Sequence, residues 1–470
     1  EHIGQEIPKY NDGEDLSLLY ENIDDFFDYF DEVKDSGSEL QKSKNVFTRT
    51  LKKENVYFDV IVFDLDETLI QTSALKDFRG NNNLNNFSKI YEKELKGALK
   101  KEFEILEESF LIRLRKLFSQ TKFFIFTDSP KNYANILLKY YYPKISWDGI
   151  IAFEDLAKHK PDPQGILKIQ QLSKTEKSGR IAIMGDIDKD IILAYQAGCF
   201  SILSRFAWSN EWHNKGSRFY NEHYEALKLI PDAIANNKND IIEILKNPWE
   251  WVPPLENIRI NKERLFASTK RDIDTLNVFN PLGNDGGYND NYITVDVLGR
   301  YFSTKIWKYN FSTKKDLSSS TKEILNAKDT NQFPNSWIKV VVKYLRELIS
   351  NASSFENKKT LVTVIPSRPG RPNRMEIMLN NVKDLFTKNE ESSSVSFIPN
   401  LFYFKDGVKP NKELNKVERY KNIRDNLVKN DNADVENKCV IVIDDVVTTG
   451  SSLFFANHIL FRNSASKIKC

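Results

Sequence analysis

Cysteine is scarce in this sequence. The 470 residues include three cysteines, Cys199, Cys439 and Cys470, and none of them forms a closely spaced pair with another. This scarcity argues against a disulfide framework and against a zinc cluster. It is typical of a reducing compartment, so we expect a cytoplasmic protein.

The sequence also lacks a long apolar run and a surplus of one charge. No uninterrupted apolar segment is long enough to span a bilayer, and no signal peptide is visible, so we expect no membrane association. The formal net charge is only +2, which does not indicate nucleic acid or an acidic membrane as a partner. A protein partner and a homo-oligomer both stay open.

The length of the chain predicts more than one domain. A chain of 470 residues exceeds the size at which one core keeps growing. The hydrophobic share of 40% supports buried cores, and the charged share of 29% is ordinary for a soluble protein. We therefore expect two or three domains.

The first 50 residues predict an amphipathic helix, with aspartates on one face and apolar side chains on the other. The apolar positions are Leu16, Leu19, Tyr20, Ile23, Phe26, Phe27 and Phe30. Such a helix can bind a partner, but amphipathic helices usually pack locally, so we expect this one to dock on its own domain.

The stretch from Val60 to Ile70 is the centre of the first half of the chain. Its β-branched and aromatic residues predict a strand buried on both faces, as in a parallel sheet. The strand ends at two carboxylates two positions apart, Asp64 and Asp66, followed by the hydroxyl of Thr68. Ligands of open α/β sheets bind beyond the carboxyl ends of the strands, so these acids would lie at the mouth of a site. The spacing alone is equally typical of an ordinary acidic turn.

Three further stretches follow in order along the chain. Phe123 to Thr127 is an apolar run that ends in a hydroxyl, His159 to Pro163 contains Lys160, and Ile181 to Asp190 is a strand followed by Gly-Asp-x-x-x-Asp. Together with the run from Asp64 to Thr68, they resemble the four motifs of the haloacid dehalogenase superfamily, whose phosphatases carry them in this order. The resemblance covers residues 58–200 and implies an α/β fold with a parallel sheet.

The resemblance implies catalytic roles for four residues. Asp64 would be the nucleophile that forms an aspartyl-phosphate, and Asp66 would be the acid/base that protonates the leaving group. Thr127 and Lys160 would bind the phosphoryl oxygens, and Lys160 would also keep the crowded carboxylates ionised. These residue types suit the reaction, because a phosphomonoester is attacked most easily by an anionic oxygen held in line while cationic groups neutralise the charge.

The resemblance also implies a Mg²⁺ site. Asp64, Asp66 through its backbone carbonyl, Asp186 and Asp190 would hold the ion, a hard cation that prefers oxygen ligands. The alternative for Asp186 and Asp190 is a pair of ordinary acids at a helix N-terminus, which the helix dipole favours.

Residues 73–120 lie where the resembled family inserts a cap domain. The sequence predicts a polar loop after Gly80, a charged helix over Lys89 to Lys101, and a second helix with an apolar stripe from Phe110 to Phe118. We expect a helical flap at most. A small lid leaves the site open to larger or varied phosphorylated substrates.

The middle of the chain carries little signal. The segment from Asn247 to Pro254 interrupts helix and strand alike and predicts a junction between domains. In residues 255–335 the sequence predicts one strand, Tyr292 to Phe302, and contains no recognisable motif.

The second half has a centre of its own. After a helix from Trp337 to Ile349, the strand Thr360 to Ile365 leads to the loop Pro366 to Arg371. Farther on, the apolar strand Cys439 to Ile443 leads to an acid pair and a turn of hydroxyl residues and glycine that opens a helix. Such a turn offers backbone N–H groups to a phosphate, assisted by the helix dipole. The two acids suit the paired hydroxyls of a ribose.

This last stretch resembles the phosphoribosyl pyrophosphate-binding motif of type I phosphoribosyltransferases. The resemblance implies that Asp444 and Asp445 take the ribose hydroxyls, and that Arg368 lies in the loop that binds pyrophosphate, a role that suits its guanidinium. It assigns the 5′-phosphate to a turn of four residues: Thr448, Thr449, Gly450 and Ser451.

The rest of the second half leaves several alternatives open. The basic run from Lys409 to Lys421 resembles the mobile loop of competence-associated members of that family, but a solvated charge run has the same composition. No residue clearly selects a base, so the acceptor is undetermined. The family usually continues beyond the strand that begins at Ser466, whereas this chain ends at Cys470.

We therefore predict an α/β protein with two Rossmann-like, doubly wound parallel-sheet domains and an N-terminal helical segment. The predicted parts are an acidic helical segment (1–50), a haloacid dehalogenase-like hydrolase with a small cap (51–247), a linker or subdomain (248–335) and a phosphoribosyltransferase-like domain (336–470).

The preferred functional hypothesis is a bifunctional Mg²⁺-dependent enzyme acting on nucleotides or phosphoribosyl compounds. Two alternatives stay open. The second domain could be a sensor that binds a nucleotide or phosphoribosyl pyrophosphate (PRPP) and regulates the phosphatase. The whole chain could be a partner-controlled stress or antiviral effector that depletes nucleotides.

Overall fold

The computed structural model describes residues 57–79, 89–208, 230–257, 270–271, 273–280, 292–302, 305–306, 309–327, 330, 332–351, 358–387, 394–409, 414–447 and 449–470. The predicted N-terminal helix lies outside the described residues, as do Thr448 and residues 410–413 of the predicted basic loop.

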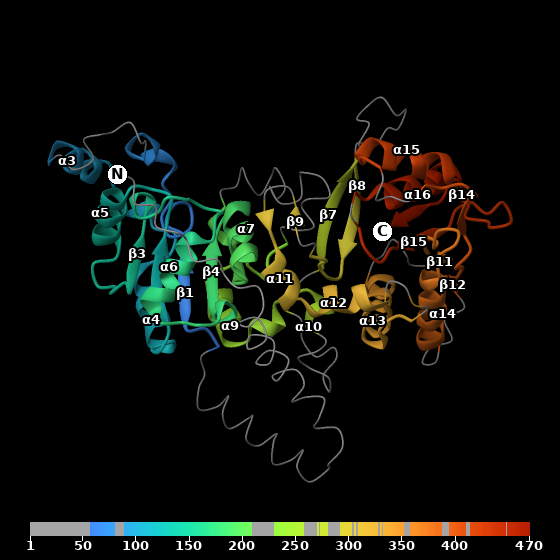
Figure 1. Ribbon diagram of the computed structural model, residues 1–470, viewed down its shortest axis with the longest axis horizontal. Coiled ribbons are helices and arrows are strands. Elements are labelled where there is room, and N and C mark those ends of the chain that lie inside the picture. Colours follow the sequence, from blue (N-terminus) through green and yellow to red (C-terminus); the bar gives the residue numbers. More distant parts are fainter. Residues whose placement is uncertain are drawn as a thin grey trace, which may run out of the picture.

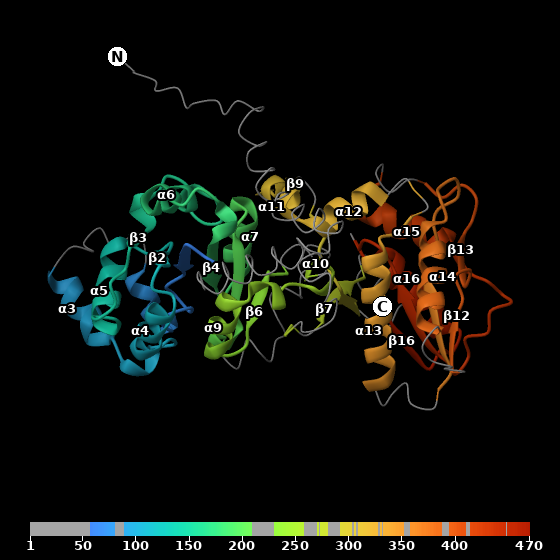
Figure 2. The same ribbon diagram turned by 90° about the horizontal axis from the view of Figure 1, so that it is seen from below.

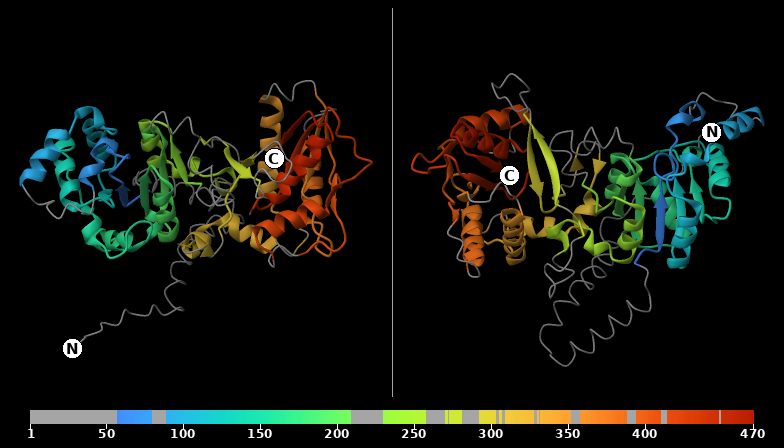
Figure 3. Two further views of the ribbon diagram at one scale, coloured as in Figure 1. Left: turned by 90° about the horizontal axis from the view of Figure 1, so that it is seen from above. Right: turned by 180° about the vertical axis from the view of Figure 1, so that it is seen from behind.

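Two parallel sheets lie at opposite ends of an elongated molecule, and a middle segment lies between them (Figure 1). The middle segment includes the strands β7 (Asp274–Phe279) and β8 (Tyr292–Val297) and the helices α10 (Pro254–Asn257), α11 (Ser312–Leu317) and α12 (Ser319–Ala327). Views from other sides show the same arrangement (Figures 2 and 3). In the part of the chain that the structure describes, no helix combines the length and the apolarity needed to cross a membrane.

The first sheet is formed by six strands, and every neighbouring pair is parallel. In order across the sheet these are β3 (Gly149–Ile151), β2 (Lys122–Phe126), β1 (Val60–Phe63), β4 (Ile181–Gly185), β5 (Phe200–Ser204) and β6 (Ala233–Ala235). The predicted central strand is β1, and all four of its residues are buried. A parallel sheet needs such apolar strands, because helices cover both of its faces.

The helices of this domain divide between the two faces. On one face, Ile61 and Phe63 share a core cluster with apolar residues of α4 (Glu108–Leu117), α5 (Lys131–Tyr141) and α9 (Lys238–Lys246). On the other face, Val60 and Val62 pack with residues of α6 (Gln164–Ser173) and α7 (Asp188–Ala197). The doubly wound arrangement predicted for this half is therefore confirmed.

The chain between β1 and β2 forms a small helical insertion. It contains the short 3₁₀ helices η1 (Ser73–Phe78) and η2 (Lys101–Phe103), the helix α3 (Lys89–Ala98) and the core helix α4. Tyr91 and Leu95 of α3 are buried in the main core, and the Tyr91 hydroxyl donates to the carbonyl of Phe78 (2.8 Å). The predicted flap is thus held against the sheet domain by one apolar face.

The second sheet has four parallel strands. Their order is β12 (Val395–Phe397), β11 (Thr360–Val364), β15 (Cys439–Ile443) and β16 (Lys467–Lys469). Helices α13 (Asn335–Asn351) and α14 (Arg374–Thr387) pack on one face, while α15 (Lys416–Asn426) and α16 (Ser451–Arg462) pack on the other. An antiparallel pair, β13 (Phe402–Phe404) and β14 (Leu427–Lys429), adjoins this sheet. The predicted second α/β domain is present, and these features leave its identity open.

The middle segment contacts both domains. Its antiparallel pair β7 (Asp274–Phe279) and β8 (Tyr292–Val297) contributes Val278 to the core around α16, and the Asp296 amide donates to the Cys470 carbonyl (2.8 Å). Farther along the chain, Phe302 and Phe311 pack edge-on against Tyr195 of α7. The remaining elements are α10 (Pro254–Asn257), β9 (Lys305–Ile306), β10 (Tyr309–Asn310), α11 (Ser312–Leu317) and α12 (Ser319–Ala327). The sequence predicted β8 and missed β7.

A buried ion-pair cluster fixes the middle segment to the first domain. Asp232, just before β6, accepts hydrogen bonds from Arg300 (2.6 Å), from Lys314 (2.8 Å) and from the hydroxyl and amide of Ser201 (2.8 Å each). Arg300 also pairs with Glu256. Burial alone would raise the pKa of Asp232, but Arg300 and Lys314 outweigh it and hold the pKa well below its usual range.

We predict that Asp232→Asn lowers the free energy of unfolding by about 3–5 kcal/mol near neutral pH, because it removes the carboxylate that Lys314 pairs with and one of the two that Arg300 pairs with. A pKa that folding depresses stabilises the native state above the unfolded pKa and ceases to do so as the pH falls. The gap between wild type and variant should therefore be constant above about pH 4 and shrink below it. Denaturant titrations between acidic and neutral pH measure this gap. The exposed Glu176→Gln is the matched control, and a gap no larger than that of the control would contradict the prediction.

Candidate functional site

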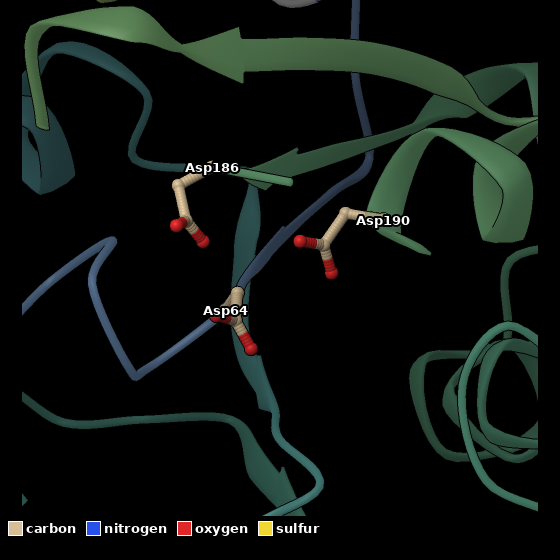
Figure 4. A group of neighbouring side chains, drawn as sticks. All are labelled: Asp64, Asp186 and Asp190. Atoms are coloured by element: carbon tan, nitrogen blue, oxygen red, sulfur yellow. The ribbon is translucent and has the colours of Figure 1, made fainter. Parts of the chain in front are cut away.

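Three carboxylates converge beyond the carboxyl ends of two neighbouring strands. Asp64 directly follows β1, Asp186 directly follows β4, and Asp190 lies in the first turn of α7. One oxygen from each lies within 4.8 Å of the other two, and the three side chains lie close together beyond the strand ends (Figure 4). Because β1 and β4 are paired in register, their ends bring acids that are more than 100 residues apart together.

Lys160 connects two of these carboxylates. Its ammonium group lies 2.7 Å from Asp64 Oδ1 and 2.7 Å from Asp190 Oδ1, and its side chain is only 4% exposed. The loop that carries it is tied to the end of β2, because Asp128 accepts a hydrogen bond from the Lys160 amide (3.2 Å) and pairs with Lys189 of α7. The predicted motifs built on Asp64, Lys160 and Asp190 therefore meet in one place.

Gly185 allows Asp190 to approach the sheet. A Cβ atom at this position would lie 2.2 Å from Asp190 Oδ2, so a larger residue would displace the carboxylate. The glycine of the Gly-Asp-x-x-x-Asp stretch is thus needed for close packing. In this arrangement Asp190 Oδ2 is buried and has no hydrogen-bond partner in the described part of the structure.

The carboxylates are crowded beyond what Lys160 can neutralise. Burial raises the pKa of Asp64 to about 7, with Asp190 and Asp66 adding to the rise and Lys160 opposing it. Burial, with the charges of Asp64 and Asp190, raises the pKa of Asp186 well above its usual range. For Lys160, burial alone would lower the pKa, but Asp190 and Asp64 outweigh it and raise the pKa. A further cation at this place would favour the ionised form of the cluster.

This donor set fits Mg²⁺. All three side chains offer carboxylate oxygens, which are the hard ligands that this ion prefers. A divalent cation would give the unpartnered Oδ2 of Asp190 a partner. Its charge would also oppose the rise in the pKa of Asp64 and of Asp186. The group includes the predicted ligands Asp64, Asp186 and Asp190, and Asp66 would add a backbone carbonyl rather than its side chain.

The Asp66 side chain is held by four donors. Its Oδ2 atom accepts from Ser129 Oγ (2.5 Å) and from Thr127 Oγ1 (3.2 Å). Its Oδ1 atom accepts from the Tyr133 hydroxyl (3.3 Å) and lies 3.3 Å from Arg79 Nη1. Thr127 had been predicted to bind phosphoryl oxygens, whereas in this structure its hydroxyl contacts Asp66.

Sequence reasoning missed Ser129, Tyr133 and Arg79. Ser129 is two positions after Thr127 and Tyr133 lies in the first turn of the following helix, so both could have been examined as neighbours of the motif. Arg79 is in the insertion, outside every motif, and no pattern in the sequence singles it out.

The turn after β1 fixes the orientation of the acids. Glu67 has a positive φ of 57°, which reverses the chain directly after Asp66. Its carboxylate accepts hydrogen bonds from the amide (2.9 Å) and hydroxyl (3.4 Å) of Thr72. Thr68 is fully buried and donates to Asp186 (3.2 Å), so this turn joins the first and fourth motifs.

The acid pair of the second sheet occupies the corresponding place after β15. Asp444 and Asp445 follow this central strand, and Gly450 has a φ of 71° at the N-cap of α16. Burial raises the pKa of Asp444 well above its usual range, and Asp445 adds to the effect. Asp445 is paired with Arg374 from the start of α14, a residue that the sequence analysis did not identify.

The other predicted residues of the second site that the structure describes, Arg368, Thr449, Gly450 and Ser451, lie around the same strand ends. The hydroxyls of Thr449 and Ser451 lie 2.9 Å apart at the beginning of α16. Arg368, in the loop after β11, stacks over Phe404 (5.7 Å to the ring centre) and donates to the carbonyl of Lys409. A Cβ atom on Gly450 would lie 2.2 Å from a methyl group of Val278, so β7 closely covers this turn.

Comparison with known proteins identifies part of the chain. Residues 73–204 match the family model described as haloacid dehalogenase-like hydrolase, and this region is a haloacid dehalogenase-like hydrolase domain. The match includes Thr127, Lys160, Asp186 and Asp190, and begins after Asp64. It does not extend to the second sheet.

Several solved structures are similar to part of the chain. One is a predicted phosphoglycolate phosphatase from Haemophilus somnus (19% identity, 40% of this chain and 98% of that chain, TM-score 0.28). Another is a haloacid dehalogenase-superfamily hydrolase of subfamily IA from Geobacter sulfurreducens (15% identity, 40% and 97%, TM-score 0.26). A third is CbbY from Rhodobacter sphaeroides, solved with phosphate (17% identity, 31% and 86%, TM-score 0.23). No curated protein matches the chain.

Proposed function

We propose that the first domain is a Mg²⁺-dependent phosphohydrolase that hydrolyses phosphomonoesters through an aspartyl-phosphate on Asp64. The observation that carries this proposal is the position of Lys160, 2.7 Å from both Asp64 and Asp190 and almost completely buried. A buried lysine among several acids creates a local site that can bind an anion and a metal ion together. The haloacid dehalogenase-like family match supports the same class of reaction.

The residues suggest the following steps. A carboxylate oxygen of Asp64 attacks the phosphorus, the bond from phosphorus to the leaving oxygen breaks, and Asp66 gives that oxygen a proton. Water then attacks the phosphorus of the aspartyl-phosphate, a proton returns to Asp66, and phosphate leaves. Lys160 stabilises charge on the phosphoryl oxygens, and Thr127, whose hydroxyl contacts Asp66, helps to hold the acid/base in place. Mg²⁺, held by Asp64, Asp186, Asp190 and the Asp66 carbonyl, would supply charge neutralisation.

The four donors around Asp66 support its separate role. Hydrogen bonds from Ser129, Thr127 and Tyr133 and an ion pair with Arg79 hold its side chain, whereas Lys160 contacts Asp64 and Asp190. Two carboxylates two positions apart thus have different surroundings, as two groups with different roles would.

We further propose that the second domain binds a phosphorylated ribose compound, either PRPP or a nucleotide. The acid pair Asp444 and Asp445 lies at the carboxyl end of a central parallel strand, where α/β sheets bind ligands. The glycine turn and the hydroxyls of Thr449 and Ser451 lie at the N-terminus of α16, a 12-residue helix suited to a phosphate.

Phosphoribosyl transfer by this domain is the finer hypothesis. Arg368 lies on the loop after the neighbouring strand β11, as a pyrophosphate-binding residue would. A sensor that binds the same ligand without turnover would use the same residues, and so would an effector that depletes nucleotides. The release of pyrophosphate in the presence of a base separates the enzyme from the sensor.

Replacing the nucleophile tests the first proposal. Asp64→Asn should abolish hydrolysis of p-nitrophenyl phosphate, with a loss of at least about 10³-fold in kcat, because the amide has nearly the same shape but is not nucleophilic. Steady-state assays with and without Mg²⁺ measure this loss. The matched control is Asp59→Asn, at the opposite end of the same strand, where the carboxylate pairs with Arg180 on the surface. Mg²⁺-dependent turnover at the wild-type rate in Asp64→Asn would refute the assignment.

Ligand binding tests the second proposal. Calorimetry on the full chain should show binding of PRPP, assisted by Mg²⁺, or of a nucleoside 5′-phosphate. The double variant Asp444→Asn/Asp445→Asn should bind at least about tenfold more weakly, since amides accept weaker hydrogen bonds from ribose hydroxyls than carboxylates do. The exposed Asp431→Asn in the same domain is the control. Absence of binding at millimolar concentration, or equal binding by the double variant, would contradict this proposal.

A further inference from the structure

Arg79 brings a positive charge from the insertion to the proposed active site. Its Nη1 atom lies 3.3 Å from Asp66 Oδ1. Among the ion pairs of the described residues, the pair of Arg79 with Asp66 joins a cation of the insertion to one of the motif carboxylates. The other three donors to Asp66, which are Thr127, Ser129 and Tyr133, all come from the end of β2 and from α5.

A short folded turn holds Arg79 in this position. Its Nη2 atom donates to the Thr72 carbonyl (3.2 Å), and its backbone amide donates to the Lys76 carbonyl (3.1 Å). Thr72 is in turn bound to the Glu67 carboxylate next to Asp66. The guanidinium is therefore placed by the same turn that orients the motif acids.

The contact between Arg79 and Asp66 is open to exchange. Only one nitrogen of Arg79 approaches the carboxylate, and 23% of the arginine side chain is exposed. Partly exposed ion pairs with a single contact stabilise proteins little. A guanidinium carries five N–H donors in a planar fork, which leaves several for a carboxylate or phosphate of a ligand.

The two cationic groups contact different carboxylates of the proposed active site. Lys160 contacts Asp64 and Asp190, the proposed nucleophile and metal ligand, so it serves the phosphoryl group. Arg79 contacts Asp66, which protonates the leaving oxygen. Because Asp66 has to reach the leaving oxygen in the proposed reaction, a cation 3.3 Å from Asp66 lies near the leaving group of the substrate.

We infer that Arg79 binds a second anionic group on the substrate, and that the enzyme prefers phosphomonoesters whose alcohol carries a carboxylate or another phosphate. The inference rests on the proposed phosphohydrolase function and adds the substrate class. The bidentate fork of Arg79 takes the second anion while Lys160 takes the phosphoryl group. Arg79 thus acts as a specificity-determining residue.

Three substrates with the same three-carbon chain test the inference. Their leaving groups are 3-hydroxypropionate, the monophosphate of 1,3-propanediol, and uncharged 1,3-propanediol. The wild-type protein should hydrolyse each of the two anionic esters with a kcat/KM at least about tenfold above that of the neutral one, chiefly through a lower KM, as a charge-assisted hydrogen bond provides. Which of the two is better tells whether a carboxylate or a phosphate is preferred.

The variants Arg79→Gln and Arg79→Lys supply the decisive comparison. Arg79→Gln should reduce the preference for the anionic esters to about one, and Arg79→Lys should restore part of it, because lysine keeps the charge but loses the fork. The control is Lys76→Gln, an exposed lysine on the same 3₁₀ helix, which should keep the wild-type preference. Thermal unfolding shows whether each variant is folded.

The outcomes separate this inference from the proposal beneath it. An active wild-type protein without a preference would overturn the inference alone. A preference that Arg79→Gln leaves unchanged, or an equal loss on all three esters that Arg79→Lys does not repair, would also overturn it, since Arg79 would then only hold the insertion in place. Failure of the wild-type protein to hydrolyse any of the three esters would overturn the proposed function together with the inference.

Discussion

The ion pairs of Lys160 with Asp64 and Asp190 are the interaction on which the first site depends. They join the end of β1, the loop before α6 and the first turn of α7, three segments that are far apart in the sequence. Placing one cation among four acids is unfavourable unless every charge has a partner. Gly185 and the turn at Glu67 make the close approach feasible, and Asp128 ties the lysine loop to the sheet. The remaining negative charge is what makes the cluster suited to a divalent metal.

The second structural constraint is the buried cluster around Asp232. It lies next to the edge strand β6 of the first sheet and holds the middle segment through Arg300 and Lys314. The same segment reaches the second sheet, where Val278 covers the turn at Gly450. The middle segment is also linked to the loop that carries Lys160. Gln196 of α7 accepts a hydrogen bond from the Asn310 amide (3.2 Å) and donates one to the Pro161 carbonyl (2.6 Å). The two proposed sites are therefore connected through packed and hydrogen-bonded elements. Regulation of one site by the other would require the middle segment to adopt two arrangements that the two ligands favour differently.

The sequence predicted the features that rest on local pattern. The buried strands β1, β2, β4, β11 and β15 are runs of apolar residues, and motif acids and glycines follow them at fixed spacing, so Asp64, Lys160, Asp186 and Asp190 could all be found. Contacts between distant segments could not. Arg79 meets Asp66, Arg374 meets Asp445 and Arg300 meets Asp232 only once the chain is folded, and no periodicity marks such pairs. Strand β7 was missed because its alternation of buried Leu276 and Val278 with polar neighbours covers only six residues.

The central claim is that Asp64 becomes covalently phosphorylated during turnover, and trapping the intermediate tests it most directly. Wild-type protein would be mixed with a ³²P-labelled phosphomonoester and Mg²⁺, quenched in acid within the first turnover, and digested for peptide mapping by mass spectrometry. The account predicts hydroxylamine-sensitive label on the peptide that contains Asp64, and no label when the substrate is omitted or after complete turnover. Hydrolysis that proceeds with no labelled protein at any time, or with the label on a residue other than Asp64, would contradict it.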